Sequence, residues 1–293
     1  MSGVDDDEIE ASRAPLMEHL VELRRRLIVC VAAFVVAFLF CFAFSQQIYL
    51  ALLHPFVMAA SMVAAQKTGG HHGPFDLLKV LFGLIPPPPG EQALRLVFTA
   101  PLEFFFTKMK LAGFGAIVIA FPVLASQLYR FVAPGLYKRE KHAFLPFLIA
   151  SPVLFAMGAA LVYYIMLPFV LWFSLSQQIT TGNISVELLP KVSDYLDLVT
   201  KLLLAFGLCF QLPVILSLAG LAGLVQSSTL AKGRRYAAVA IVFVAAIVTP
   251  PDPLTQILLS VPIYLLYEIS IWCVRLMEVR RKRAESTELT TTD

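Results

Sequence analysis

Long stretches without a charged residue constrain the fold of this chain more than any other feature. Residues Ala143 to Phe173 contain no Asp, Glu, Lys or Arg over 31 positions, Leu202 to Val225 contain none over 24, and Leu27 to Phe44 contain neither a charge nor a proline. A helix needs roughly 20 apolar residues to cross a hydrocarbon layer about 30 Å thick. With 58% hydrophobic and 15% charged residues and a mean hydropathy of +0.78, the 293-residue chain lies outside the soluble globular class.

Three weaker apolar segments raise the predicted number of spans to six. Leu111 to Ala125 reaches full length only by extending back through Phe104, while Tyr236 to Val248 has 13 residues and Leu254 to Tyr267 has 14. The sequence therefore predicts an all-α, polytopic integral membrane protein with spans at about 24–45, 103–130, 143–174, 195–225, 234–249 and 254–274. This membrane domain, residues 14–275, is expected to lie between an acidic tail at 1–13, too polar to pack and therefore disordered, and a basic, then polar, tail at 276–293.

The basic residues predict the orientation of these spans. Of the 23 Lys and Arg residues, 16 lie in segments that six spans place on the same side as the N-terminus. Because cytoplasmic segments carry the excess of Lys and Arg, both termini are expected in the cytoplasm. The stretch after Arg24, Arg25 and Arg26 is not expected to be a cleaved export signal, because it is as long as a full span and follows Glu18 and Glu22.

The outer segment from Gln46 to Pro101 is predicted to be the longest loop. Residues 76–85 are a candidate short amphipathic or re-entrant helix ahead of four consecutive prolines at 86–89. His71 and His72 have no Cys or further His nearby, so an exposed loop is preferred to a metal site. All four cysteines lie in apolar segments and are expected to be small hydrophobic residues without disulfides: Cys30, Cys41, Cys209 and Cys273.

Polar residues within the spans are few, and each needs a partner. Asp197 and Lys201 lie four apart on one helix face and could pair, although the preferred interpretation of the lysine is that it extends to the membrane interface. Gln211 lies about 15 Å further along the same span, near mid-membrane. It is expected to bond either within the protein or to a docked helix.

The last two spans leave alternatives open. The turn Thr249-Pro250-Pro251-Asp252 between these short helices either dips toward bilayer depth or is an ordinary tight turn. Glu268, near the inner end of the last span, either pairs structurally with Arg275 or Arg235 or has a functional role. Five prolines lie inside predicted spans and either kink the helices around a concave surface or are only packing features: Pro122, Pro152, Pro168, Pro213 and Pro262.

One inner loop, Arg130 to Lys141, holds a single carboxylate among basic residues. Pro134 and Gly135 fix its turn, which presents Glu140 and the Tyr137 ring in one orientation. An acid held in this way suits recognition of a cationic group.

At these residues the chain resembles the TatC family of twin-arginine translocase subunits. The resemblance covers residues 15 to 275 and rests on four motifs in order: His19 to Leu27 (HLVELRRRL), Pro101 to Leu111 (PLEFFFTKMKL), Phe131 to Glu140 (FVAPGLYKRE), and Thr249 to Asp252 with Gln256. It implies a cup-like arrangement of six transmembrane helices. It also implies recognition of twin-arginine signal peptides at the cytoplasmic face and export of folded proteins across the bacterial inner membrane, driven by the proton-motive force.

The family's signal-peptide contacts carry over to matching positions: Glu22, Arg24, Phe131, Pro134, Leu136, Tyr137, Lys138 and Glu140. Two consecutive arginines offer planar forks that carboxylates accept bidentately, so Glu22 and Glu140 are plausible acceptors. The alternative for Glu22 is an i,i+4 pair with Arg26, and for Glu140 a local pair with Lys138 or Arg139.

The resemblance further implies the single-span partners TatA and TatB, in a hetero-oligomer of several copies surrounded by membrane lipid. Thr249, Gln256 and Gln211 are the expected contacts with these partners, and Asp252 is expected to be structural within the polar turn. Where the family commonly has a Glu, this chain has Gln211, which cannot carry charge. The long outer loop matches nothing in the family pattern.

No enzymatic activity, cofactor, metal or nucleic acid is expected. The predicted spans contain no Ser/His, paired Asp or His-x-x-x-His arrangement of the kind an intramembrane enzyme needs. The competing class is a small-molecule secondary transporter, which kinked helices and embedded polar groups alone would permit.

Overall fold

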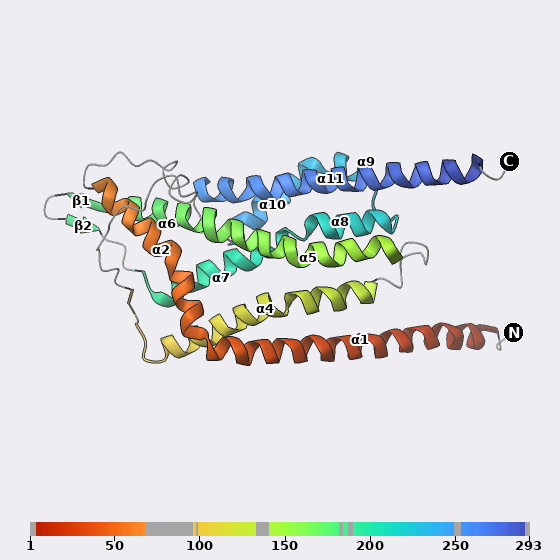
Figure 1. Ribbon diagram of the computed structural model, residues 1–293, viewed down its shortest axis with the longest axis horizontal. Helices are drawn as coiled ribbons and strands as arrows, with labels where there is room; N and C mark the ends of the chain where they lie inside the picture. The colour runs from red at the N-terminus through yellow and green to blue at the C-terminus, as the bar shows by residue number, and fades with distance from the viewer. Residues whose placement is uncertain are drawn as a thin grey trace.

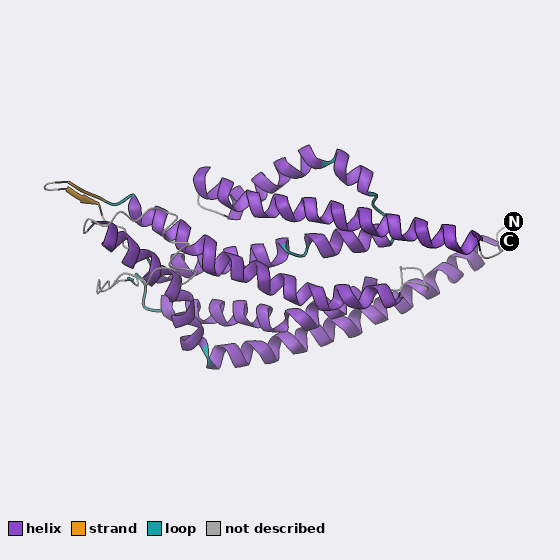
Figure 2. Ribbon diagram, turned by 45° about the horizontal axis from the view of Figure 1, so that its top comes forward, coloured by secondary structure: helices purple, strands orange, loops and turns teal. Residues whose placement is uncertain are grey.

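The computed structural model describes residues 4–67, 96–97, 99–132, 141–181, 184–186, 190–248 and 253–290, and helices dominate it (Figures 1 and 2). The α-helices are α1 (Val4–Ala43), α2 (Ser45–Lys67), α4 (Glu103–Val132), α5 (Lys141–Leu161), α6 (Leu167–Ser176), α7 (Val192–Cys209), α8 (Leu212–Leu221), α9 (Ser227–Lys232), α10 (Arg234–Val248) and α11 (Pro253–Thr290). A π-helix, Val162–Met166, joins α5 to α6. Two short strands, β1 (Ile179–Thr181) and β2 (Ile184–Val186), form an antiparallel hairpin.

Six stretches are long and apolar enough to cross a membrane, which confirms the predicted all-α membrane fold. They are Leu20–Ala43, Ser45–Val63, Glu103–Phe131, Pro146–Ser176, Val192–Leu221 and Thr255–Arg280. The segments that qualify as spans differ from the prediction in two places. Helix α2 occupies the start of the predicted outer loop, and α10, predicted as a span at 234–249, has only 15 residues, or about 22 Å of helix.

The direction of α2 separates it from the other helices. Helices α1, α4, α5 with α6, α7 with α8, and α11 run along the long axis of the molecule, whereas α2 crosses the end opposite the termini and packs on α6 (Figure 1). The apolar pattern missed α2 because Gln46, Gln47, His54 and Pro55 interrupt it, and its mean hydropathy is 1.2 against 2.7 for the span in α1.

The helices pack as a row with α1 and α11 at opposite edges. Helix α1 packs on α4, α4 on α5 and α7, α8 on α11, and α11 on α10. Small residues let α1 and α4 approach closely, since Ala37, Ala116 and Ala120 are buried between them. The first residues of α1 and the last of α11 lie at one end of the molecule (Figure 1), as six spans require.

The N-terminal segment is helical where disorder was predicted, and the C-terminal segment, predicted only as a basic, then polar, tail, is helical as well. Helix α1 begins at Val4, within the segment 1–13 that the sequence predicted to be disordered, and α11 continues to Thr290, through most of the predicted tail 276–293. A helix that is already anchored in the bundle extends one residue at a time without a new nucleation step. Low hydrophobicity alone therefore does not end it.

The prolines divide the spans in two ways. Pro122, Pro152 and Pro262 lie inside helices α4, α5 and α11. Pro168 and Pro213 instead lie in the first turns of α6 and α8, so each follows a departure from regular α-helix, a π-helix before Pro168 and a turn before Pro213. Proline has no backbone N–H, so it cannot donate to the turn that precedes it. The π-helix before Pro168 and the turn at Phe210–Gln211 before Pro213 lie where this hydrogen bond is missing.

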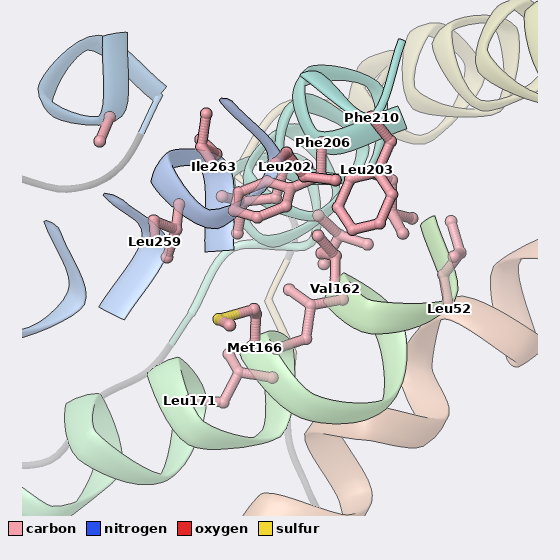
Figure 3. Close-up of a cluster of buried hydrophobic side chains, with 14 of the residues drawn as sticks. Leu52, Val162, Met166, Leu171, Leu202, Leu203, Phe206, Phe210, Leu259 and Ile263 are labelled. Carbon is pink, nitrogen blue, oxygen red and sulfur yellow. The ribbon is translucent and has the colours of Figure 1, made fainter. Parts of the chain in front are cut away.

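The main core lies where α2, the π-helix, α7 and α11 converge (Figure 3). Phe206, Leu202 and Val162 are almost completely buried there, and Leu259 enters from α11. Two tyrosine hydroxyls donate hydrogen bonds to backbone carbonyls of the kinked helix α2 and so hold it against this core. Tyr195 donates to the Leu52 carbonyl at 2.6 Å, and Tyr163 donates to the Ala51 carbonyl at 2.6 Å.

Candidate functional site

A polar pocket lies between α1 and α4 near the end of the molecule where the termini are. Glu22, Arg25, Arg26 and Val29 of α1 line it at helical i, i+3, i+4, i+7 spacing, and α4 contributes Gln127 and Arg130, also one turn apart; its volume is about 270 Å³. Close packing of α1 on α4 gives the pocket its two walls. The pocket therefore contains three guanidinium groups and one carboxylate.

Glu22 already has a partner in this pocket. Its carboxylate accepts from the guanidinium of Arg26, and the two side chains are 35% and 20% exposed. This is the i,i+4 pair that the sequence offered as an alternative role for Glu22. Arg24 is exposed and does not line the pocket, because a helix places it about 100° away from Arg25.

The inner loop's predicted contacts are described only at its start. Phe131, in the last turn of α4, is half-buried. Helix α4 ends at Val132 and α5 begins at Lys141, on the side of the molecule where the termini lie (Figure 1). The other predicted contacts, Pro134, Leu136, Tyr137, Lys138 and Glu140, lie outside the described residues.

Gln211 is buried within the bundle and bonds inside the protein. Its Oε1 accepts from the Ser151 hydroxyl at 2.6 Å, and its Nε2 donates to the Ser151 carbonyl at 3.0 Å. Tyr129 donates to the same hydroxyl at 3.3 Å, which links α4, α5 and the α7–α8 break. Of the two partners the sequence allowed, an internal group or a docked helix, the internal one is present. Ser151 and Tyr129 were not predicted, because neither carries a sequence signal beyond being polar in an apolar stretch.

A second pocket lies between α10 and α11, with a volume of about 490 Å³. Its walls are mostly apolar, and Gln256 and Ser260 are among its few polar residues. The Gln256 amide donates to the Val242 carbonyl at 3.2 Å, across the two helices. The predicted contact Thr249 and the turn residue Asp252 lie outside the described residues, as do His71 and His72.

Two ion pairs that the sequence suggested have other partners in the structure. Asp197 pairs with Lys110 of α4 at 3.0 Å rather than with Lys201, and Glu268 pairs with Arg234 of α10 at 2.8 Å rather than with Arg275 or Arg235. In both cases a long basic side chain on a neighbouring helix reaches the carboxylate. Spacing along one helix does not show this neighbour for Asp197, whereas for Glu268 the alternative Arg235 named the correct helix but the residue next to the actual partner.

Glu103 anchors the N-terminal end of α4. Its carboxylate accepts from the Thr99 and Ala100 backbone amides at 2.7 and 3.1 Å, and from the Ser193 hydroxyl of α7 at 2.6 Å. The bond between Glu103 and Ser193 and the Lys110–Asp197 pair fix α4 against α7 at the end of α4 that lies away from the pocket between α1 and α4.

Comparisons with known proteins agree with the motifs. Residues 18–262 match the family model described as Sec-independent protein translocase protein (TatC). A relative of that name from Magnetococcus marinus is 42% identical over 276 residues, which cover 94% of this chain and 89% of the relative. Another from Rickettsia prowazekii is 34% identical, with 90% and 94% covered. A crystal structure described as the twin arginine translocase receptor TatC is similar with a TM-score of 0.68 and 31% identity, covering 88% of this chain and 98% of that one.

Proposed function

Because this chain belongs to the TatC family of Sec-independent protein translocase proteins, we propose that it recognises twin-arginine signal peptides and directs folded proteins to export. Its family and its apolar helices make it a multi-pass protein of the bacterial inner membrane and a component of the Tat translocase. The role is that of a receptor, without a chemical step. The comparisons favour this function over a small-molecule secondary transporter.

The observation that carries the proposal is the position of Glu22. It faces a pocket on the side of the molecule where α4 ends and α5 begins, and the predicted recognition loop is the segment that connects these two helices. Both termini and this pocket face the cytoplasm in the proposed orientation, because that end carries most of the basic residues. Precursors that await export are on that side.

Recognition proceeds by exchange of ion-pair partners. The Glu22 carboxylate now accepts from Arg26, and an arginine of the signal peptide replaces that guanidinium with the same planar geometry. Glu140 accepts the second arginine. Arg24 and Lys138 repel cations in other positions, and Phe131, Pro134, Leu136 and Tyr137 hold the peptide in register.

The partners TatA and TatB are proposed to bind along α10 and α11. The apolar pocket there suits a single membrane helix, with Gln256 and Thr249 as polar contacts. Gln211 is only 4% exposed, so a partner reaches it only if the surrounding helices separate. Several copies of each subunit form the working complex, and the proton-motive force drives transport.

Photo-crosslinking of a twin-arginine precursor tests the site. Glu22→Gln and Glu140→Gln are each expected to remove most of the crosslinks to the signal peptide and to reduce export, because Gln keeps the shape but loses the charge. Glu268→Gln is the matched control, since Glu268 is also paired with an arginine but lies away from the pocket. Unchanged crosslinking and export in both site variants would show that these acids do not hold the arginines.

A further inference from the structure

The pocket between α1 and α4 has more positive charge than recognition of arginines requires. Arg25, Arg26 and Arg130 converge on it with a single carboxylate, Glu22. Glu22 is paired with Arg26, and among the described residues neither Arg25 nor Arg130 has a carboxylate partner. Both groups are cations, so they do not attract a signal-peptide arginine. They would attract a bound anion.

The donors in this pocket suit a phosphate group. Arginine presents planar N–H donors that match phosphate oxygens bidentately, and Gln127 adds an amide beside them. Arg25 and Arg130 project from separate helices that pack closely, so both guanidinium groups can contact the same anion while each backbone stays fixed. At about 270 Å³ the pocket holds a headgroup phosphate but no folded partner.

The location favours a lipid as the source of that phosphate. The pocket lies near the ends of two apolar stretches, Leu20–Ala43 and Glu103–Phe131, where a bilayer changes from hydrocarbon to headgroups. Val29 forms its apolar side, and Ile28 and Leu128, next to pocket residues, are 57% and 60% exposed. These surfaces offer contact for acyl chains directly beside the arginines.

We propose that this pocket binds the phosphate of an anionic phospholipid in the leaflet next to the termini. Arg25 and Arg130 hold the phosphate, Gln127 donates to it, and the acyl chains lie along the exposed apolar faces of α1 and α4. Basic pockets between membrane helices bind lipid headgroups in this way. The inference rests on the pocket alone and does not require that Glu22 binds signal peptides.

Native mass spectrometry of the full chain in detergent measures this binding directly. Phosphatidylglycerol is expected to bind more tightly than phosphatidylcholine of the same acyl chains, and inorganic phosphate is not expected to displace it. Arg130→Gln and Arg25→Gln should each weaken phosphatidylglycerol binding roughly fivefold, the effect of one basic residue near a membrane surface. Arg280→Gln is the control. It removes one exposed charge from α11, the helix at the opposite edge of the row from α1, and should keep the wild-type affinity.

Three outcomes would overturn the proposal. Equal binding of both lipids would show that net charge does not matter, and an equal loss in Arg280→Gln would show general attraction rather than a site. Displacement of the lipid by inorganic phosphate would show that free phosphate, not a lipid, is the ligand. Because Arg25 and Arg130 are both exposed, their replacement leaves the core intact, and gel filtration of each variant checks this.

Discussion

At the scale of single residues, the buried bond between Gln211 and Ser151 makes the sharpest prediction. Gln211→Leu leaves the fully buried Ser151 hydroxyl without its 2.6 Å acceptor, and Ser151→Ala leaves the amide oxygen without its donor. Each variant is expected to lower the free energy of unfolding by about 1–3 kcal/mol, the cost of an unsatisfied buried polar group. Thermal unfolding in detergent measures the change.

The double variant separates this bond from simple loss of packing. The double variant removes both members of the pair, so neither leaves the other unsatisfied, and Tyr129 loses the Ser151 hydroxyl in the double variant just as it does in Ser151→Ala. The double variant should therefore lose less stability than the two single losses added together. Additive losses would show that the two side chains do not act as a pair.

The sequence predicted that Gln211 needs a partner but did not identify that partner, for a physical reason. An isolated polar residue in an apolar span must bond to something, so its need for a partner is readable from the sequence. Ser151 lies 60 residues away on another helix, and only packing of α5 against α7 brings it close. The choice of Lys201 for Asp197 has the same origin, since its actual partner Lys110 lies on another helix.

At the scale of elements, the close approach of α1 and α4 depends on Gly115. A Cβ added at Gly115 would lie 2.8 Å from the Cys41 sulfur, whereas one added at Gly113, on another face of α4, would meet no atom within 4 Å. Gly115→Ala is therefore expected to destabilise the protein by about 1–3 kcal/mol through overpacking. Gly113→Ala, as the control, should leave the thermal midpoint unchanged or slightly higher, because Ala is the better helix former. Equal effects would show that this helix contact is not tight.

The kink of α2 makes a second prediction about elements. Pro55 has no N–H to donate to the Ala51 carbonyl, and the Tyr163 hydroxyl donates to that carbonyl instead. Tyr163→Phe is expected to cost on the order of 1 kcal/mol of unfolding free energy in the wild type and less in Pro55→Ala, where the helix supplies the donor.

Tyr195→Phe, measured in the wild type and in Pro55→Ala, is the matched control for Tyr163→Phe. Tyr195 donates to the Leu52 carbonyl, whose helical donor, the amide of Phe56, is not affected by Pro55. Its cost should therefore be the same in both backgrounds. Equal coupling of both tyrosines to Pro55 in thermal unfolding would contradict the explanation.

Apolar runs predicted the long helices well and the irregular ones poorly. The runs at Ala143 to Phe173 and Leu202 to Val225 correspond to spans in the structure, because composition alone decides whether a helix suits a membrane. Composition does not show that Pro168 follows a π-helix or that Pro213 opens α8, since local backbone geometry decides these breaks. Helix α2 was missed because its polar residues and Pro55 are tolerated through contacts with α6 and the tyrosines.

At the scale of the whole molecule, the arrangement predicts which surfaces face each compartment. Helix α6 leads into the β1–β2 hairpin at the end opposite the termini, while α9 follows α8 on the side of the termini (Figure 1). Ser176, at the end of α6, and Ser228, in α9, are both exposed serines and form a matched pair for labelling. The excess of basic residues assigns Ser228 to the cytoplasm and Ser176 to the outer side.

Cysteine labelling in spheroplasts checks this assignment. In a background where the four native cysteines are replaced by alanine, a membrane-impermeant maleimide should label Ser176→Cys in intact spheroplasts. It should label Ser228→Cys only after the membrane is opened, because the bilayer excludes the charged reagent. The reverse pattern would place the termini and the Glu22 pocket outside the cell, where no precursor awaits export, and would contradict the proposed receptor role. Labelling of both positions in intact spheroplasts would contradict the assignment of Ser228 to the cytoplasm.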